Sequence, residues 1–222
     1  MKNLLFICIA FGILFLFSCE KEAEEICEST KIGEQGLSES SKFGYLPYLA
    51  GQQINFTNEA GETIAFTAQV EQNMDNRICF RELCEAFSSP TSAPICEFYE
   101  TESLKNTLTS EDGSISIALE ASIYSYPQGA TSFLDLFTMV GRTQGRTIGN
   151  VTQISGSTYD GTINYPSSYP PINIFIRGGD ITLNGIEFSS VFHTEIADDM
   201  LFYQLGRGVV GMSIAGDTLV IN

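Results

Sequence analysis

The sequence predicts an all-β domain in which an antiparallel meander curves into a closed or half-open barrel. Hydrophobic and polar residues alternate along several short segments, most regularly at residues 114–124, where Ile115, Ile117 and Leu119 share one face. Glycines and turn-forming dipeptides separate these segments. No segment has the long 3.6-residue periodicity of an amphipathic helix. A two-sheet sandwich is the alternative, because periodicity does not distinguish it from a barrel.

About ten strands are expected, and the first of them form a hairpin. Residues 53–57 and 63–70 alternate on either side of the turn-like stretch 58–61. Residues 131–140 favour a strand but also fit a short helix capped by Ser132. The other strands expected in the first two thirds of the chain are residues 77–84, 95–101 and 114–124.

Residues 141–171 differ from the rest of the chain because they are rich in Gly, Thr, Ser, Tyr and Pro. This composition predicts a long irregular loop, and loops of this length are often functional. The C-terminal third predicts a second meander in which Asn184-Gly185 forms a type I′ turn. Its expected strands are residues 172–176, 181–183, 186–192, 200–205, 209–214 and 218–221.

The N-terminus has the parts of an export signal. Lys2 is followed by an apolar run at residues 4–17, which is too short to span a bilayer as a helix. The next stretch, Leu16-Phe17-Ser18-Cys19, resembles the lipobox of bacterial lipoproteins. The resemblance implies cleavage after Ser18 and a diacylglyceryl group on Cys19. A plain secretory signal and an uncleaved membrane anchor are the alternatives.

The acidic stretch after Cys19, residues 20–25, resembles the tether of Bacteroidota lipoproteins, in which such residues direct export to the cell surface. The resemblance implies an outer-membrane lipoprotein exposed at the surface; the periplasmic face of the outer membrane is the alternative. Composition alone also fits a solvated linker. The expected organisation is a signal peptide at residues 1–18, a lipidated tether at 19–42 and one all-β domain at 43–222.

Two further stretches resemble uncharacterised all-β lipoproteins of the same group. The first runs from Tyr45-Leu46-Pro47-Tyr48 to Asn58-Glu59-Ala60-Gly61, and the second is the ending from Leu201-Phe202-Tyr203 to Gly216-Asp217. The resemblance implies an all-β lipoprotein, and the expected barrel is similar in outline to lipocalin-like or lipoprotein-carrier folds. The resemblance carries no catalytic residues.

The net charge is strongly negative. Eleven basic and 27 acidic residues give −16, and removal of residues 1–18 takes away Lys2 and no acidic residue, which makes the mature chain −17. This charge repels phosphate backbones, so no nucleic-acid partner is expected. It also opposes binding to anionic lipid surfaces, so membrane contact is expected through the lipid on Cys19. An outer-membrane protein is a further expected partner.

Four cysteines remain in the body once Cys8 is removed and Cys19 carries lipid. An even number of cysteines in an exported chain predicts two disulfides, for which three pairings exist. We expect Cys84 to pair with Cys96, closing a loop that contains two prolines, and Cys27 to pair with Cys79. A zinc site is the rival interpretation, but the spacing from Cys79 to Cys84 is wider than in zinc knuckles. No metal or cofactor is expected.

No catalytic motif stands out. His193 is the only histidine, and no Gly-x-Ser-x-Gly nucleophile elbow is present. Asp75 and the pair Asp198-Asp199 could bind calcium, but no EF-hand spacing accompanies them. The chain is therefore not expected to be an enzyme.

The expected function is a non-catalytic binding module for a small or hydrophobic ligand or a glycan. Binding is expected in a concavity of the sheet or through residues 141–171, where Tyr159, Tyr165 and Tyr169 could stack on sugar rings. The alternative is a structural or accessory subunit of an outer-membrane assembly.

Overall fold

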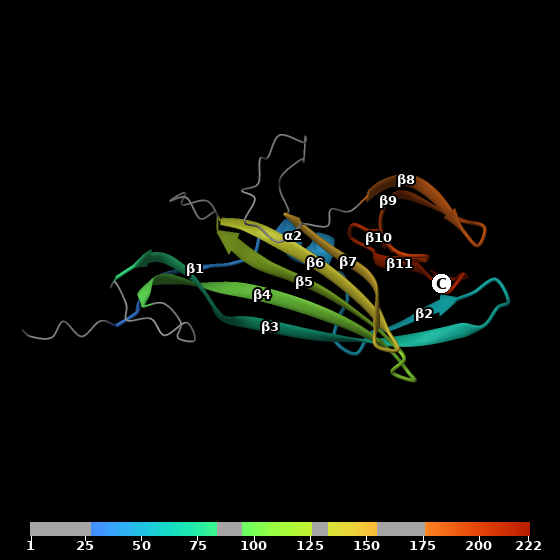
Figure 1. The fold of residues 1–222 in the computed structure, drawn as a ribbon, viewed down its shortest axis with the longest axis horizontal. Coiled ribbons are helices and arrows are strands. Elements are labelled where there is room, and N and C mark those ends of the chain that lie inside the picture. Colours follow the sequence, from blue (N-terminus) through green and yellow to red (C-terminus); the bar gives the residue numbers. More distant parts are fainter. Residues whose placement is uncertain (1–27, 84–94, 126–132, 155–175) are drawn as a thin grey trace, which may run out of the picture.

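The computed structural model describes residues 28–83, 95–125, 133–154 and 176–222 (Figure 1). The signal peptide, residues 19–27 of the expected tether, and Tyr159, Tyr165 and Tyr169 lie outside these ranges. The described elements are β1 (Thr30–Gln35), α2 (Glu39–Tyr45), β2 (Gln53–Thr57), β3 (Thr63–Glu82), β4 (Cys96–Ser110), β5 (Ile115–Ser125), β6 (Phe133–Thr143), β7 (Arg146–Ile154), β8 (Ile176–Leu183), β9 (Ile186–Ile196), β10 (Asp199–Gln204), β11 (Gly208–Ile214) and β12 (Asp217–Ile221).

The twelve strands form one strongly curled sheet, which confirms the all-β prediction and its half-open barrel form. Strands β2 to β7 make one antiparallel meander and β8 to β12 make a second. The two meanders join where β12 pairs with β2, with Val220 opposite Thr57 and Ile221 opposite Phe56. This pairing brings the C-terminus beside the first strand of the main meander.

β7 is an edge strand of the hydrogen-bonded sheet. The curl of the sheet nevertheless brings β7 against β9 and β10. The approach is close because glycines face the partner strands. A Cβ atom on Gly149 would lie 2.6 Å from Leu201 Cδ1, and one on Gly141 would lie 2.5 Å from the same atom. Arg146 and the buried Asp199 form an ion pair of 2.9 Å at one end of this contact. Side-chain packing therefore brings the two ends of the curl together.

The prediction of a long loop at residues 141–171 is wrong for the first part of that range. β6 continues to Thr143 and β7 begins at Arg146, and Gln144 and Gly145 between them both have positive φ, as in a type I′ hairpin turn. Sequence reasoning interpreted the glycines here as loop residues. In the fold, Gly141 and Gly149 lie within strands, where only a hydrogen atom fits against Leu201.

The β8–β9 hairpin folds back and creates a second hydrophobic core. The turn Asn184-Gly185 has positive φ at both residues, which confirms the type I′ prediction. Asn184 Nδ2 donates to the backbone oxygen of Thr218 at 2.8 Å, so the hairpin tip is held against β12. The second core is separate from the main one and consists of Leu183, Phe188, Val191, Phe202, Val210 and Val220.

Strands β1, β3 and β4 extend beyond the barrel as an arm, at the left of Figure 1. We use "arm" for β1, residues 73–83 and residues 95–101. β3 is one continuous strand with an irregularity between Asn73 and Asn76, where the sequence predicted two strands. β1 pairs with β4 in parallel, from Thr30 opposite Glu97 to Gln35 opposite Thr101. Regular structure therefore begins within the stretch expected to be tether.

Candidate functional site

The inside of the curl, where a barrel of this kind could hold a ligand, is occupied by α2 and the residues that follow it. The Tyr45 ring stacks on Phe137 of β6 with ring centroids 4.5 Å apart, and Phe137 lies 5.4 Å from the ring of Tyr203 on β10. The Tyr203 hydroxyl donates to the backbone oxygen of Gly44 at 2.8 Å. Next, the backbone N–H of Val209 donates to the Tyr48 hydroxyl at 2.6 Å. Aromatic residues thus connect the helix to opposite walls of the curl.

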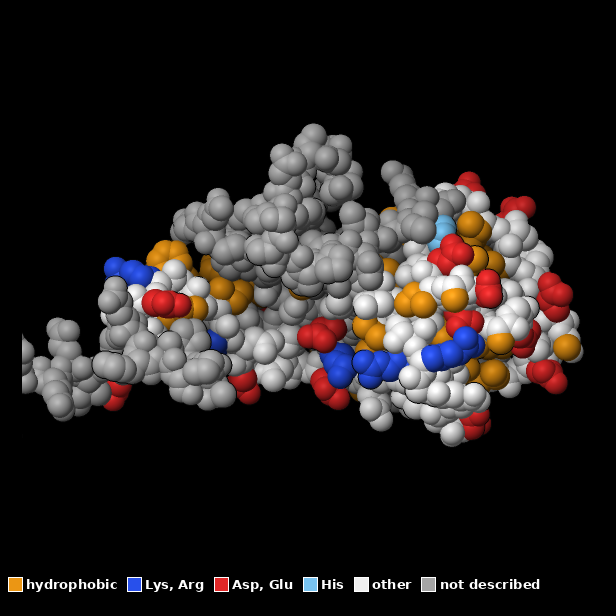
Figure 2. Space-filling model, in the orientation of Figure 1, with side chains coloured by type: hydrophobic (Ala, Val, Ile, Leu, Met, Phe, Trp, Pro, Cys, Tyr) orange, Lys and Arg blue, Asp and Glu red, His pale blue; other side chains and the backbone are white. Residues whose placement is uncertain are grey.

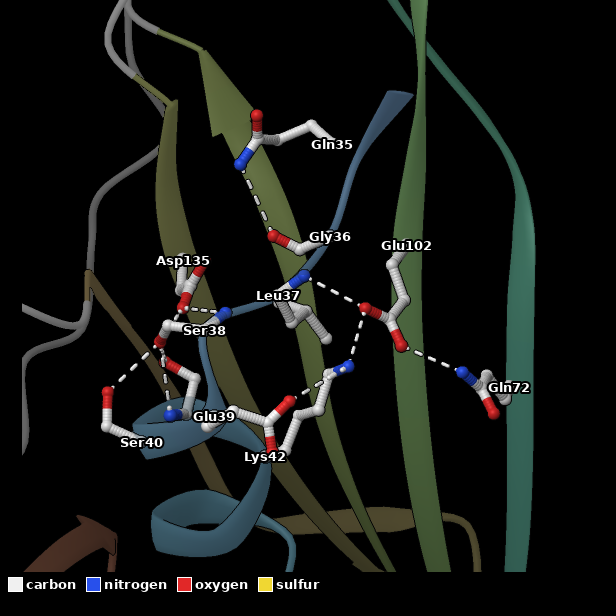
Figure 3. Close-up of polar contacts among 11 residues, drawn as sticks. Gln35, Gly36, Leu37, Ser38, Glu39, Ser40, Lys42, Gln72, Glu102 and Asp135 are labelled. Atoms are coloured by element: carbon white, nitrogen blue, oxygen red, sulfur yellow. Dashed lines mark hydrogen bonds and ion pairs between the residues drawn. The ribbon is translucent and has the colours of Figure 1, made fainter. Parts of the chain in front are cut away.

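A buried carboxylate holds the N-terminal side of α2 to the sheet (Figure 3). Glu102 on β4 accepts hydrogen bonds from the Leu37 backbone N–H at 2.9 Å and from Gln72 Nε2 at 2.8 Å. Its carboxylate also pairs with Lys42 Nζ at 3.0 Å, and its side chain is only 5% exposed. One side chain therefore joins the segment before the helix, the helix itself and strand β3.

Electrostatics favours the charged form of both members of this pair. Desolvation opposes ionisation of Glu102, but hydrogen bonds from Lys42, Leu37 and Gln72 outweigh it and lower the pKa of the carboxyl. The hydrogen bond from Lys42 to Glu102 raises the pKa of the Lys42 ammonium, against a smaller opposing effect of desolvation. The ion pair is consequently fully formed at neutral pH.

A second carboxylate caps the helix. Ser38 is the N-cap of α2, where its hydroxyl oxygen accepts a hydrogen bond from the Ser41 backbone N–H. Asp135 on β6 accepts hydrogen bonds from both the backbone N–H and the hydroxyl of Ser38. Glu102 and Asp135 therefore fasten the start of α2 to two strands of the sheet.

Two surface depressions lie outside this packed interior. One, of about 390 Å³, lies between the segment after α2, strand β2 and the β10–β11 turn, and Tyr48, Gln52, Asn55 and Arg207 contribute to its lining. The other, of about 540 Å³, lies on the β8–β9 hairpin. Both volumes fall within the usual range of ligand sites. The lining residues of the second depression are Asp180, Ile181, Thr182, Glu187, Phe188 and Ser189.

The β8–β9 depression combines carboxylates and hydroxyls, and Ile181 and Phe188 are the apolar residues of its lining. Glu187 and Thr182 are opposite each other in the β8–β9 register, and both are exposed. Asp180 accepts the backbone N–H of Ser190 at 3.2 Å, which holds its carboxylate in the hairpin. Phe188 is buried, with the Arg207 guanidinium 5.1 Å from its ring centroid. Figure 2 shows acidic side chains across the right-hand end of the molecule, where the β8–β9 and β2–β3 hairpins lie.

Few of the predicted site residues lie in the part of the chain that the structure describes. Cys19, Cys27 and Cys84 lie outside the described residues, so neither expected disulfide is tested. Cys79 and Cys96 are described, and both are free thiols. His193 on β9 lies opposite Phe202 on β10, with ring centroids 6.1 Å apart. Asp199 is a structural residue, because it accepts the Ala215 backbone N–H at 2.9 Å in addition to its pairing with Arg146.

Sequence reasoning missed Glu102 and the lining of the β8–β9 depression. Glu102 lies two and six positions before Leu104 and Leu108, on the same face of the strand, and this charge in register with apolar residues was the available signal for a buried carboxylate. Asp180 and Glu187 carried no such signal, since acidic residues beside a hairpin turn are ordinary.

Comparison of the chain with known protein families, curated proteins and solved structures finds no match. Among the described residues, no helix is long and apolar enough to cross a membrane. The same residues contain no group of three or more His, Cys, Asp or Glu side chains arranged to hold a metal ion. Fold and geometry alone therefore define the class, which is a curled all-β half-barrel with a helix packed inside it.

Proposed function

We propose that the protein is a non-catalytic binding module that is anchored to the outer membrane through a lipid on Cys19, faces the cell surface and binds a neutral glycan. The observation that carries this proposal is the depression of about 540 Å³ on the β8–β9 hairpin, with its carboxylate and hydroxyl lining. The lipobox-like stretch that ends at Cys19 supports the anchor.

The chemistry of the lining favours a ligand rich in hydroxyl groups. Carboxylates accept hydrogen bonds from sugar hydroxyls, and such charge-assisted bonds are the stronger kind. Thr182 and Ser189 can both donate and accept. Because Asp180 and Glu187 are negative, the depression disfavours phosphorylated or uronic-acid-containing glycans.

The filled interior supports surface binding over transport of an apolar ligand inside the barrel. Phe137, Tyr203 and Met139 are fully buried, and α2 packs on them from within the curl. Small-molecule carriers of barrel type instead hold their ligand inside the barrel. A glycan-binding module needs only the outer depression.

Replacing Glu187 with glutamine is expected to weaken binding of a neutral oligosaccharide about tenfold, the loss that follows when a charge-assisted hydrogen bond is weakened by about 1.4 kcal/mol. The measurement is a screen of the mature chain against neutral and acidic oligosaccharides, followed by titration calorimetry on the best binder. Glu195→Gln is the matched control, because Glu195 is an exposed carboxylate on β9 outside the depression. If no neutral oligosaccharide binds, or if both variants bind equally, the glycan proposal is wrong.

Lipidation of Cys19 is tested separately, by labelling with a fatty acid. Cells fed an alkyne fatty acid are expected to label the wild-type chain, and the label should be lost in Cys19→Ala. Cys27→Ala is the control and should label normally, since Cys27 lies outside the lipobox-like stretch. Labelling of the Cys19→Ala chain would contradict lipidation at that residue.

A second candidate function is an accessory subunit of an outer-membrane assembly, and the arm is the observation that favours it. Four large hydrophobic side chains on the arm are at least one third exposed: Ile32, Met74, Phe80 and Leu83. Exposed apolar residues of this size are common where proteins meet. Co-purification of one outer-membrane protein with the wild-type chain, lost in Phe80→Ser, would favour this function over glycan binding.

A further inference from the structure

Two cysteines from distant parts of the sequence share one face of the arm. In the β3–β4 register, Cys79 is opposite Phe98 and Cys96 is opposite Glu82. Residues two apart on a strand point to the same side, so Cys96 and Phe98 share a face, and Cys79 lies on that face as the partner of Phe98. The register shifts between Cys79 and Arg81, which leaves Phe80 as the extra residue of a bulge. Cys79 and Cys96 are therefore diagonal neighbours across the ladder.

The two thiols are neighbours. The Cys96 side chain lies near enough to the Cys79 thiol to act on its ionisation, and both cysteines are free in the structure. Cys96 is buried, with 5% of its surface exposed, whereas Cys79 is exposed. The backbone N–H of Cys96 donates to Ser29 Oγ at 3.2 Å, which holds the start of β1 against the same end of β4. One sulfur is thus accessible from solvent and the other is held beside it.

We propose that Cys79 and Cys96 form a disulfide in the exported protein, so that one bridge joins β3 and β4 across the arm. The oxidant is a disulfide-bearing thiol oxidase or a small-molecule disulfide. One cysteine thiolate attacks that disulfide and releases a thiol, and the second cysteine then attacks the mixed disulfide and releases the second thiol. Two electrons and two protons pass from the cysteines to the oxidant.

This pairing differs from the one expected from sequence, in which Cys96 joined Cys84 and Cys79 joined Cys27. Sequence spacing favoured Cys84 because a bridge to Cys96 closes a short loop. The β3–β4 register instead brings Cys79 beside Cys96. Cys27 and Cys84 are then the two body cysteines that remain.

The state of the Cys79 thiol indicates when the bridge forms. Desolvation and the neighbouring Cys96 side chain raise its pKa to about 12. Because the thiolate is the reactive form, a folded reduced arm is expected to oxidise slowly at neutral pH. The bridge is therefore expected to form while the arm is still folding.

Peptide mapping tests the connectivity. The full mature chain is purified from cells without reductant, its free thiols are alkylated, and it is cut after Lys or Arg and after Glu. These cuts place Cys79 in the peptide 78–81, Cys84 in 83–85, Cys96 in 86–97 and Cys27 in 26–28. We expect 78–81 linked to 86–97, and loss of that linked peptide after reduction. A link from 78–81 to either of the other two cysteine peptides would overturn the proposal.

A double variant, Cys27→Ser with Cys84→Ser, leaves Cys79 and Cys96 as the body cysteines. It is expected to keep the 78–81 to 86–97 link and to show no free thiol in unfolding conditions. Two free thiols after refolding with oxidised glutathione would overturn the proposal. A link that forms with glutathione in the wild-type chain but is absent from cells would instead contradict export, so the two failures are distinguishable.

Discussion

Replacing Phe137 with alanine is expected to lower the free energy of unfolding by about 3–5 kcal/mol, the usual cost of removing a buried phenylalanine ring. Phe137 is fully buried and lies between the rings of Tyr45 and Tyr203. Its loss leaves a cavity at the point where α2 meets the sheet and removes two aromatic contacts. Chemical denaturation followed by tyrosine fluorescence or circular dichroism measures the change.

Two control variants test whether the loss of stability in Phe137→Ala comes from the buried ring. Phe137→Leu fills most of the volume and is expected to cost about 1–1.5 kcal/mol. Phe80→Ala removes a ring that is 48% exposed on the arm, and is expected to change stability by less than about 1 kcal/mol. Equal effects of Phe137→Ala and Phe80→Ala would show that α2 is not packed inside the curl as described.

Replacing Glu102 with alanine is expected to cost about 2–4 kcal/mol, because it leaves the Leu37 N–H, Gln72 and Lys42 without their common acceptor. Lys42 is 27% exposed and regains water, so the cost is below that of a fully buried pair. Glu71→Ala, on an exposed site of β3, is the control and should change stability by less than about 0.5 kcal/mol. Denaturant unfolding of both variants at pH 7 is the measurement.

The same pair gives a pH dependence with a defined sign. The folded-state pKa of Glu102 lies below its unfolded value, so its stabilisation is complete above an unfolded pKa of about 4.3 and is lost as pH falls through the folded pKa. The difference in unfolding free energy between wild type and Glu102→Ala is therefore expected to shrink as pH falls below about 4. A difference that stays constant down to pH 2 would contradict a buried, ionised Glu102.

Local pattern predicted strands such as β5 well because β5 buries one face. Ile115, Ile117 and Leu119 alternate in the sequence, and all three are buried in β5. The Asn184-Gly185 turn was equally predictable from the sequence, since its two residues tolerate positive φ. The pairing of strands that are distant in the sequence was not predictable. The β2–β12 pairing consists of two residue pairs whose members are more than 150 positions apart, and such a pairing leaves no local pattern in the sequence.

The candidate site was less predictable than the fold. The sequence favoured tyrosines at residues 159–169, which lie outside the described residues, whereas the described depression is built from ordinary hairpin residues such as Thr182 and Glu187. Their juxtaposition depends on the register of β8 and β9. The same holds for Cys79 and Cys96, because a bulge in β3 decides which thiols meet.

The parallel pairing of β1 with β4 has a mechanical consequence. In the proposed lipid-anchored state, any pull between the membrane and the domain passes through Thr30, the first residue of β1, at the outer end of the arm (Figure 1). Tension along the chain then acts parallel to the strand, so the β1–β4 hydrogen bonds resist it together and in shear. The domain would therefore withstand drag at the cell surface far better than if β1 could be peeled away one bond at a time.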